Sequence, residues 1–145
     1  MFFGTYKHTI DDNGRLTVPA RLRESVIQSQ DGPRLFLACG AEKCIVAYTQ
    51  TRISEILDGT KNGSISREQA REFKRIFGGE GAMQPWDKQG RILLPDNLKD
   101  YAGITREVNI VGALDCIEIW DAQAYVTRLD SAKAAYDDIA GKIIP

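Results

Sequence analysis

The sequence of 145 residues has few of the features that mark a catalytic, metal-binding or membrane protein. It contains one histidine, and its three cysteines are odd in number and lack the Cys-x-x-Cys spacing of a zinc site. No apolar run approaches the ~20 residues of a membrane-spanning helix. These absences favour reduced, buried thiols. They predict a protein with no cofactor, no metal, no membrane association and no small-molecule substrate.

Charges of the two signs are almost balanced. The 19 Lys and Arg residues face 20 Asp and Glu residues, which gives a net charge of −1. A nucleic-acid-binding face would therefore have to be a local patch. The 43% hydrophobic and 27% charged content is typical of a globular chain. The first residues, 1–4, have too short an apolar run for a signal peptide, so we expect a soluble, cytoplasmic protein.

One stretch of the chain occurs twice, with its first Asp at position 11 and again at position 87. Asp-Asp-Asn-Gly-Arg at 11–15 returns as Asp-Lys-Gln-Gly-Arg at 87–91, and Pro19 returns as Pro95. Such self-similarity decides the architecture before any local prediction. Each copy predicts a tight turn, because a polar residue followed by Gly tolerates positive φ. The Pro then ends a strand and opens a short helix.

The surrounding segments predict the same order of elements in both copies. We expect a β-hairpin-like unit from residues 5–10 and 16–18, and a second hairpin from 34–39 and 44–48, matched by 108–111 and 117–120. Residues 66–69 form a capping box for a helix that Gly78 and Gly79 would stop, and Asp121 would cap a C-terminal helix. We expect the apolar stripe of that helix to be core. Each copy is near the size at which a single core is marginal, so we expect the copies to share a core or to pair with other chains, and to dock side by side. The stripe consists of Tyr125, Leu129, Ala132, Tyr136 and Ile139.

The paired Asp-x-x-Gly-Arg motifs, together with the segments 1–4, 18–23 and 114–120, resemble the MraZ family of bacterial proteins over essentially the whole chain. The resemblance implies an α+β, mainly β fold of two tandem swapped-hairpin AbrB-like β-barrel units, with short helices and a C-terminal helix. We place the first repeat at 1–57, a connecting loop and helix at 58–78, and the second repeat with the C-terminal helix at 79–145.

The resemblance also implies a function. Members of the family are expected to be sequence-specific DNA-binding transcriptional regulators of the bacterial division and cell-wall gene cluster. They would bind short repeated boxes in double-stranded promoter DNA as ring-shaped homo-oligomers, in the cytoplasm and associated with the nucleoid. The family usually carries Lys before the Gly of the first motif, whereas this chain has Asn13, which removes one candidate phosphate contact.

The two copies differ in charge, and the first is the more basic. Residues 16–18 alternate between apolar and polar side chains, which predicts a half-exposed strand. The matching run Ile92-Leu93-Leu94 is apolar throughout, which predicts a strand buried on both faces. We therefore predict that the first copy contacts DNA, with Arg15 at the turn reading a guanine edge. The predicted DNA-binding residues are Arg15, Lys7, Arg21, Arg23 and His8, where the second copy has Arg91, Met83, Asn97, Lys99 and Gln84.

Three alternatives remain for these residues. Asp11 with Arg15, and Asp87 with Arg91, could be structural ion pairs that fix the turns or a subunit seam. The repeated Asp could instead belong to a duplicated aspartic hydrolase, in which two carboxylates share a proton. An Arg four residues after each Asp favours an ionised carboxylate over that chemistry, so we expect no enzyme. The third alternative is an antitoxin-like interaction module of the same fold that binds no DNA.

Overall fold

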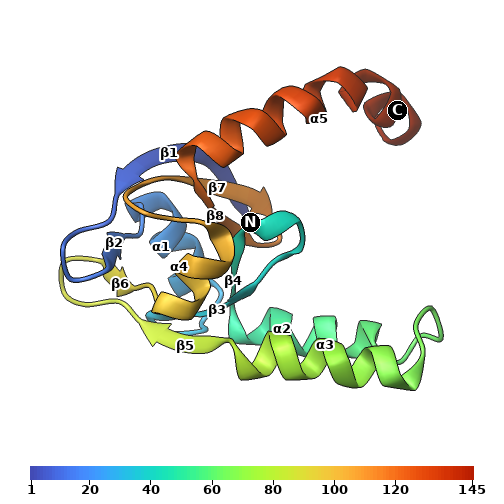
Figure 1. Ribbon diagram of the computed structural model, residues 1–145, viewed down its shortest axis with the longest axis horizontal. Helices are drawn as coiled ribbons and strands as arrows, with labels where there is room; N and C mark the ends of the chain where they lie inside the picture. The colour runs from blue at the N-terminus through green and yellow to red at the C-terminus, as the bar shows by residue number, and fades with distance from the viewer.

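The computed structural model describes all 145 residues and has the predicted α+β architecture, with short helices and a long C-terminal helix (Figure 1). Strands and helices alternate along the chain in an order that repeats once. The elements are β1 (Phe2–Thr9), β2 (Arg15–Thr17), α1 (Ala20–Gln28), β3 (Arg34–Cys39), the 3₁₀ turn η1 (Ala41–Lys43), β4 (Ile45–Tyr48), α2 (Gln50–Gly59), α3 (Arg67–Gly79), β5 (Ala82–Pro85), β6 (Arg91–Leu93), α4 (Asp96–Ala102), β7 (Glu107–Leu114), β8 (Ile117–Asp121) and α5 (Ala122–Ile143).

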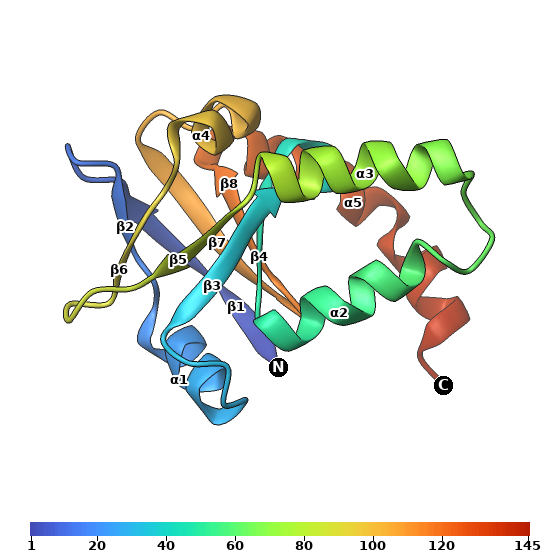
Figure 2. The ribbon, with the colours of Figure 1, turned by 90° about the horizontal axis from the view of Figure 1, so that it is seen from below.

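Six strands form one sheet in the order β1-β7-β8-β4-β3-β5, and β2 and β6 form a separate two-stranded ribbon. The repeat matches β1 with β5, β3 with β7 and β4 with β8. Exchanging each strand for its counterpart in the other repeat gives the order β5-β3-β4-β8-β7-β1, which is the observed order read backwards. The sheet therefore has an internal two-fold symmetry. Each repeat therefore gives its first strand to the other repeat, because β1 pairs with β7 and β5 pairs with β3 (Figure 2).

The predicted hairpin of residues 5–10 with 16–18 is wrong. β1 pairs along its whole length with β7, from Phe2 opposite Leu114 to Thr9 opposite Glu107, and β2 pairs with β6. The sequence indicated the strands correctly but not their partners, because a period of two residues shows which face of a strand is buried and not which strand lies beside it.

The two copies share one core, as expected from their size, but they interleave around it, so the prediction that they dock side by side is wrong. The main cluster of 19 buried residues draws on both repeats. Leu16 and Ile92 lie directly opposite each other in the ribbon, and Leu22 of α1 and Leu98 of α4 are at most 1% exposed. The proposed boundaries of the repeats, at residues 57 and 79, stay a prediction. They do not separate two independent domains, because the main core contains residues of both repeats.

A second, smaller cluster lies under α3 and the start of α5, away from the main core. Phe77 of α3 packs against Phe36 and Tyr48, with ring centroids 5.4 and 6.0 Å apart. Buried Cys44 belongs to the same cluster, and burial raises the pKa of its thiol to about 12. All three cysteines are free, as predicted.

The capping box at the start of α3 is confirmed. The Ser66 hydroxyl accepts a hydrogen bond from the Gln69 backbone N–H at 3.0 Å, and the Gln69 side chain accepts one from the Ser66 N–H at 2.9 Å. The predicted stop at Gly78 and Gly79 is confirmed, because α3 ends at Gly79 and is capped at Glu80, with the two glycines as its last residues.

Helix α5 begins where predicted, with the Asp121 carboxylate accepting a hydrogen bond from the Ala124 N–H at 3.0 Å. The expectation that its apolar stripe is core is wrong, because no residue of the helix is buried. Figure 1 shows α5 leaving the sheet and extending beyond the rest of the molecule. No helix of the chain has the length and apolar character needed to cross a membrane.

Candidate nucleic-acid interface

The two repeated motifs form two turns built from the same hydrogen bonds. In the first turn, Asp11 Oδ1 accepts from the backbone N–H groups of Asn13 and Arg15, each at 2.9 Å. The carboxylate of Asp87 makes the equivalent two bonds in the second turn, also at 2.9 Å. Gly14 and Gly90 have φ near +77° and +78°, a conformation that L side chains rarely adopt. The shared Asp and Gly therefore shape the turns.

The second turn is also held by Arg23 of the first repeat. The Arg23 Nε donates a hydrogen bond to the Val18 carbonyl at 2.9 Å, and the Val18 N–H donates to the Gly90 carbonyl at 2.8 Å. The guanidinium packs over Gly90 so closely that a Cβ there would lie 2.6 Å from Arg23 Cζ. Arg23, one of the predicted DNA-binding residues, thus makes contacts that stabilise the fold.

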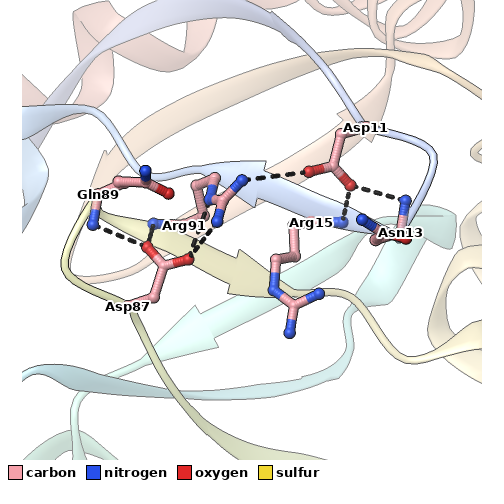
Figure 3. Close-up of polar contacts among 6 residues, drawn as sticks. All are labelled: Asp11, Asn13, Arg15, Asp87, Gln89 and Arg91. Carbon is pink, nitrogen blue, oxygen red and sulfur yellow. Dashed lines mark hydrogen bonds and ion pairs between the residues drawn. The ribbon is translucent and has the colours of Figure 1, made fainter.

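The two motif arginines have different partners, although they occupy matching positions. The Arg91 guanidinium donates to the Asp87 carboxylate at 2.9 Å and lies 3.7 Å from Asp11 of the other turn (Figure 3). The Arg15 side chain points away from Asp11 and makes no hydrogen bond or ion pair (Figure 3). Of the two pairs considered from the sequence, the structure forms Asp87 with Arg91, and Asp11 is approached by Arg91 in place of Arg15.

Pairing of β2 with β6 explains this difference. Leu16 and Ile92 point into the core, so Arg15, Thr17, Arg91 and Leu93 point outward from the ribbon, with Arg15 opposite Leu93 and Arg91 opposite Thr17. The predicted burial of 92–94 on both faces is wrong, because Leu93 is 40% exposed. Arg15 therefore lies beside an apolar neighbour that offers its guanidinium no acceptor.

The other predicted residues do not gather around Arg15. Lys7 and His8 are adjacent on β1, so their side chains point to opposite faces of the sheet; Lys7 is exposed and His8 half-buried. Exposed Arg21 lines a groove with Met1 and Phe3 at the start of β1. The turns follow the other end of that strand, after Thr9.

Sequence reasoning missed Lys88, which is exposed in the second turn. It occupies the position that Asp12 has in the first turn, so the second turn is the more basic at this position. The change from Asp12 to Lys88 is visible when the two copies are compared. In the sequence analysis it served only as an argument against a pair of catalytic carboxylates. The gain of a cation beside the ribbon is the more informative change.

The carboxylates of Asp11 and Asp87 do not form the proton-sharing pair of an aspartic hydrolase. Hydrogen bonds from the Arg15 and Arg91 backbone N–H groups lower the pKa of Asp11 and Asp87, and the Arg91 guanidinium lowers both further. A shared proton requires one carboxyl with a raised pKa. The arrangement is that of two ionised carboxylates with one guanidinium between them.

The lowered pKa values predict a loss of stability in acid. The carboxyls bind protons less readily in the folded chain than in the unfolded one, where the pKa is about 3.9. Their contribution is therefore complete above that pH and is lost as the pH falls through the folded values. Urea unfolding between pH 7 and 3 should show this decline. Asp87→Asn keeps an acceptor oxygen for the turn but has no charge, so it should flatten the decline; an unchanged pH dependence would contradict the assignment.

Comparison with known proteins agrees with the resemblance noted in the sequence. The family model described as "MraZ protein, putative antitoxin-like" matches residues 1–76 and 76–140. Proteins named "Transcriptional regulator MraZ" from Lactobacillus delbrueckii subsp. bulgaricus and Carboxydothermus hydrogenoformans are 40% and 36% identical, over 97% and 99% of this chain and 94% and 97% of theirs. The one from Kocuria rhizophila is 34% identical over all of this chain and 98% of its own. The two matched units span both turns and the interleaved sheet, and the chain belongs to the MraZ family.

Proposed function

We propose that this protein is a sequence-specific, DNA-binding transcriptional regulator of the bacterial division and cell-wall gene cluster. It binds short repeated promoter boxes as a ring-shaped homo-oligomer and works in the cytoplasm at the nucleoid. The relatives named as transcriptional regulators support the regulatory role. The double-stranded promoter and the protein itself are its partners, and it needs no enzymatic activity.

The observation that carries the proposal is the unpaired guanidinium of Arg15. Its counterpart Arg91 is held by Asp87 and Asp11, whereas Arg15 extends from a rigid ribbon without a protein partner. An arginine in this state can form the bidentate contact with the O6 and N7 atoms of guanine. The bonds that fix the turn hold the Arg15 backbone in place, so that binding has to order only the side chain.

Exposed cations elsewhere on the subunit supply contacts to the DNA backbone. Lys88 is exposed in the second turn and Lys7 is exposed on β1, and phosphate contacts of this kind fix the register of a protein on DNA without reading sequence. From Lys7 to Arg23 the chain has four Lys or Arg residues and two Asp residues. One subunit therefore binds weakly, and several subunits of a ring gain affinity from simultaneous contact with repeated boxes.

The proposal predicts steep dependence on salt and on the number of boxes. Fluorescence anisotropy with a promoter fragment should show affinity falling at least tenfold between 50 and 200 mM salt, because counterions are released from the DNA. A fragment with one box should bind at least tenfold more weakly than one with several boxes at native spacing. The control is a fragment of the same length in which the spacing between boxes is changed by half a helical turn. It should bind as weakly as the fragment with one box. Equal affinity for one box and for the array would overturn the avidity argument.

An antitoxin-like interaction module without DNA binding is the second candidate. The packing of Arg23 over Gly90 and the separation of Arg21 from Arg15 favour it, because the three arginines form no single exposed cluster in one subunit. The same anisotropy titration separates the two candidates. Binding to promoter fragments no tighter than to scrambled DNA at 150 mM salt would favour the interaction module.

A further inference from the structure

Helix α5 continues an apolar stripe beyond the part of the molecule that covers it. Near the sheet, the Tyr125 ring lies 5.8 Å from the Trp120 ring, and Leu129 is half-buried. Further along, the same face is open, with Tyr136, Ile139 and Ile143 exposed by 59%, 52% and 75%. We call this open part the distal seam. It consists of Ala132, Tyr136, Ile139 and Ile143.

The spacing along α5 is that of a coiled-coil seam. From Tyr125 to Ile143 the apolar residues follow in alternating steps of four and three, the a and d positions of a heptad repeat. The first half of the stripe packs on the protein's own sheet, and the second half presents the same pattern to solvent. A seam of this kind fits another helix with the same spacing.

We propose that the distal seams of two copies of this chain pair antiparallel around a two-fold axis. In the matching register, Ala132 faces Ile143 of the second copy and Tyr136 faces Ile139. The small Ala132 then lies opposite the large Ile143, and the flat Tyr136 ring lies opposite Ile139 instead of a second tyrosine, which suits close packing. A parallel pair would place Tyr136 against Tyr136 and leave a gap between two Ala132 residues.

The charges beside the seam agree with the antiparallel register. Lys133 comes to lie opposite Ala140 and Lys142 opposite Ala135, so no like charges face each other across the pair. The acidic side chains of the distal half, Asp130, Asp137 and Asp138, lie away from the seam on the solvent side. Arg128, nearer the sheet, is paired within its own chain with Glu42 at 3.4 Å.

The proposed contact is closed, since each copy uses the same surface. It cannot build a ring alone and joins copies in twos. From 132 to 143 the overlap is about 18 Å at 1.5 Å per residue, so one pair is weak and several pairs between oligomers reinforce one another. The inference does not depend on DNA binding.

Disulfide trapping tests both the contact and its direction. Ala132→Cys and Ile143→Cys proteins are prepared separately, oxidised with copper phenanthroline alone and as a mixture, and analysed on non-reducing gels. A disulfide dimer at least tenfold more abundant in the mixture than in either single preparation is expected, because only the pair 132 with 143 is in contact. Dimers of Ala132→Cys alone would indicate parallel pairing, and no dimer in any sample would indicate no contact; either result overturns the proposal.

Matched controls use the same helix. Ser131→Cys, off the seam and exposed, mixed with Ile143→Cys should give no more dimer than the unmodified protein. By sedimentation velocity, Ile139→Glu should weaken self-association through α5 at least tenfold, whereas Ser131→Glu should leave it unchanged. Affinity of Ile139→Glu for a single promoter box should stay as in the unmodified protein, so failure of this pairing is distinguishable from failure of the DNA-binding proposal. Equal self-association of the two Glu variants would overturn the pairing.

Discussion

Replacing Arg15 by alanine is expected to abolish specific promoter binding while leaving the fold and the oligomer intact. The Arg15 guanidinium has no partner within the protein (Figure 3), so its removal breaks no ion pair. A bidentate contact with guanine contributes about 1–3 kcal/mol to discrimination, and the loss is repeated at every subunit that contacts a box. Anisotropy with the cognate fragment and with a scrambled one should converge on the same affinity.

Arg91→Ala is the matched control for this variant. It removes the same side chain from the matching position, but one that holds Asp87 at 2.9 Å and approaches Asp11. This pair is partly exposed and screened by water, so we expect only a small loss of stability, seen as a slightly lower unfolding midpoint. Specific binding should survive at temperatures where the protein stays folded. Loss of specificity in Arg91→Ala, with Arg15→Ala unaffected, would reverse our assignment of the two copies.

Leu22→Ala and Leu98→Ala should each destabilise the whole chain by about 2–5 kcal/mol, the usual cost of such a cavity. The two leucines occupy matching positions on α1 and α4, are almost fully buried, and belong to one core. Because the repeats interleave, both variants should still unfold in one cooperative transition detected equally by circular dichroism and by tryptophan fluorescence.

Leu93→Ala provides the control, because that side chain is 40% exposed on the outer face of the ribbon. It should cost less than 1 kcal/mol. Two separate unfolding transitions in Leu22→Ala, one for each repeat, would show that the copies are independent domains and would contradict the shared core.

Local features could be predicted from the sequence, because neighbouring residues determine them. The Asp11 turn, the capping box at Ser66 and the cap at Asp121 all use hydrogen bonds between residues two to four positions apart. The hairpin of β3 and β4 was predicted for the same reason, since a short turn brings the strands together. Pairing of β1 with β7 joins residues about a hundred positions apart, and no local pattern specifies it.

The same limit applies to the candidate site. The sequence predicted a DNA contact for Arg15, from the more basic first copy, but it could not show which partners the two motif arginines have, because their motifs are nearly the same. The difference depends on the neighbours that the ribbon gives them, Leu93 and Thr17. It depends also on a pair that joins the repeats, Arg91 with Asp11. The structural use of Arg23 likewise depends on Gly90 of the other repeat.

The symmetric order of the sheet has a consequence for how the chain folds and diverges. Two separate chains of one repeat each could pair their strands in the same way, but only at concentrations where they meet. Joining the repeats through α2 and α3 makes this encounter intramolecular, so assembly of the sheet follows first-order kinetics at any dilution. Because the two copies are encoded separately, a substitution in one is no longer imposed on the other. One copy can thus keep Arg91 in ion pairs with Asp87 and Asp11, while the matching Arg15 is left free for the proposed contact with DNA.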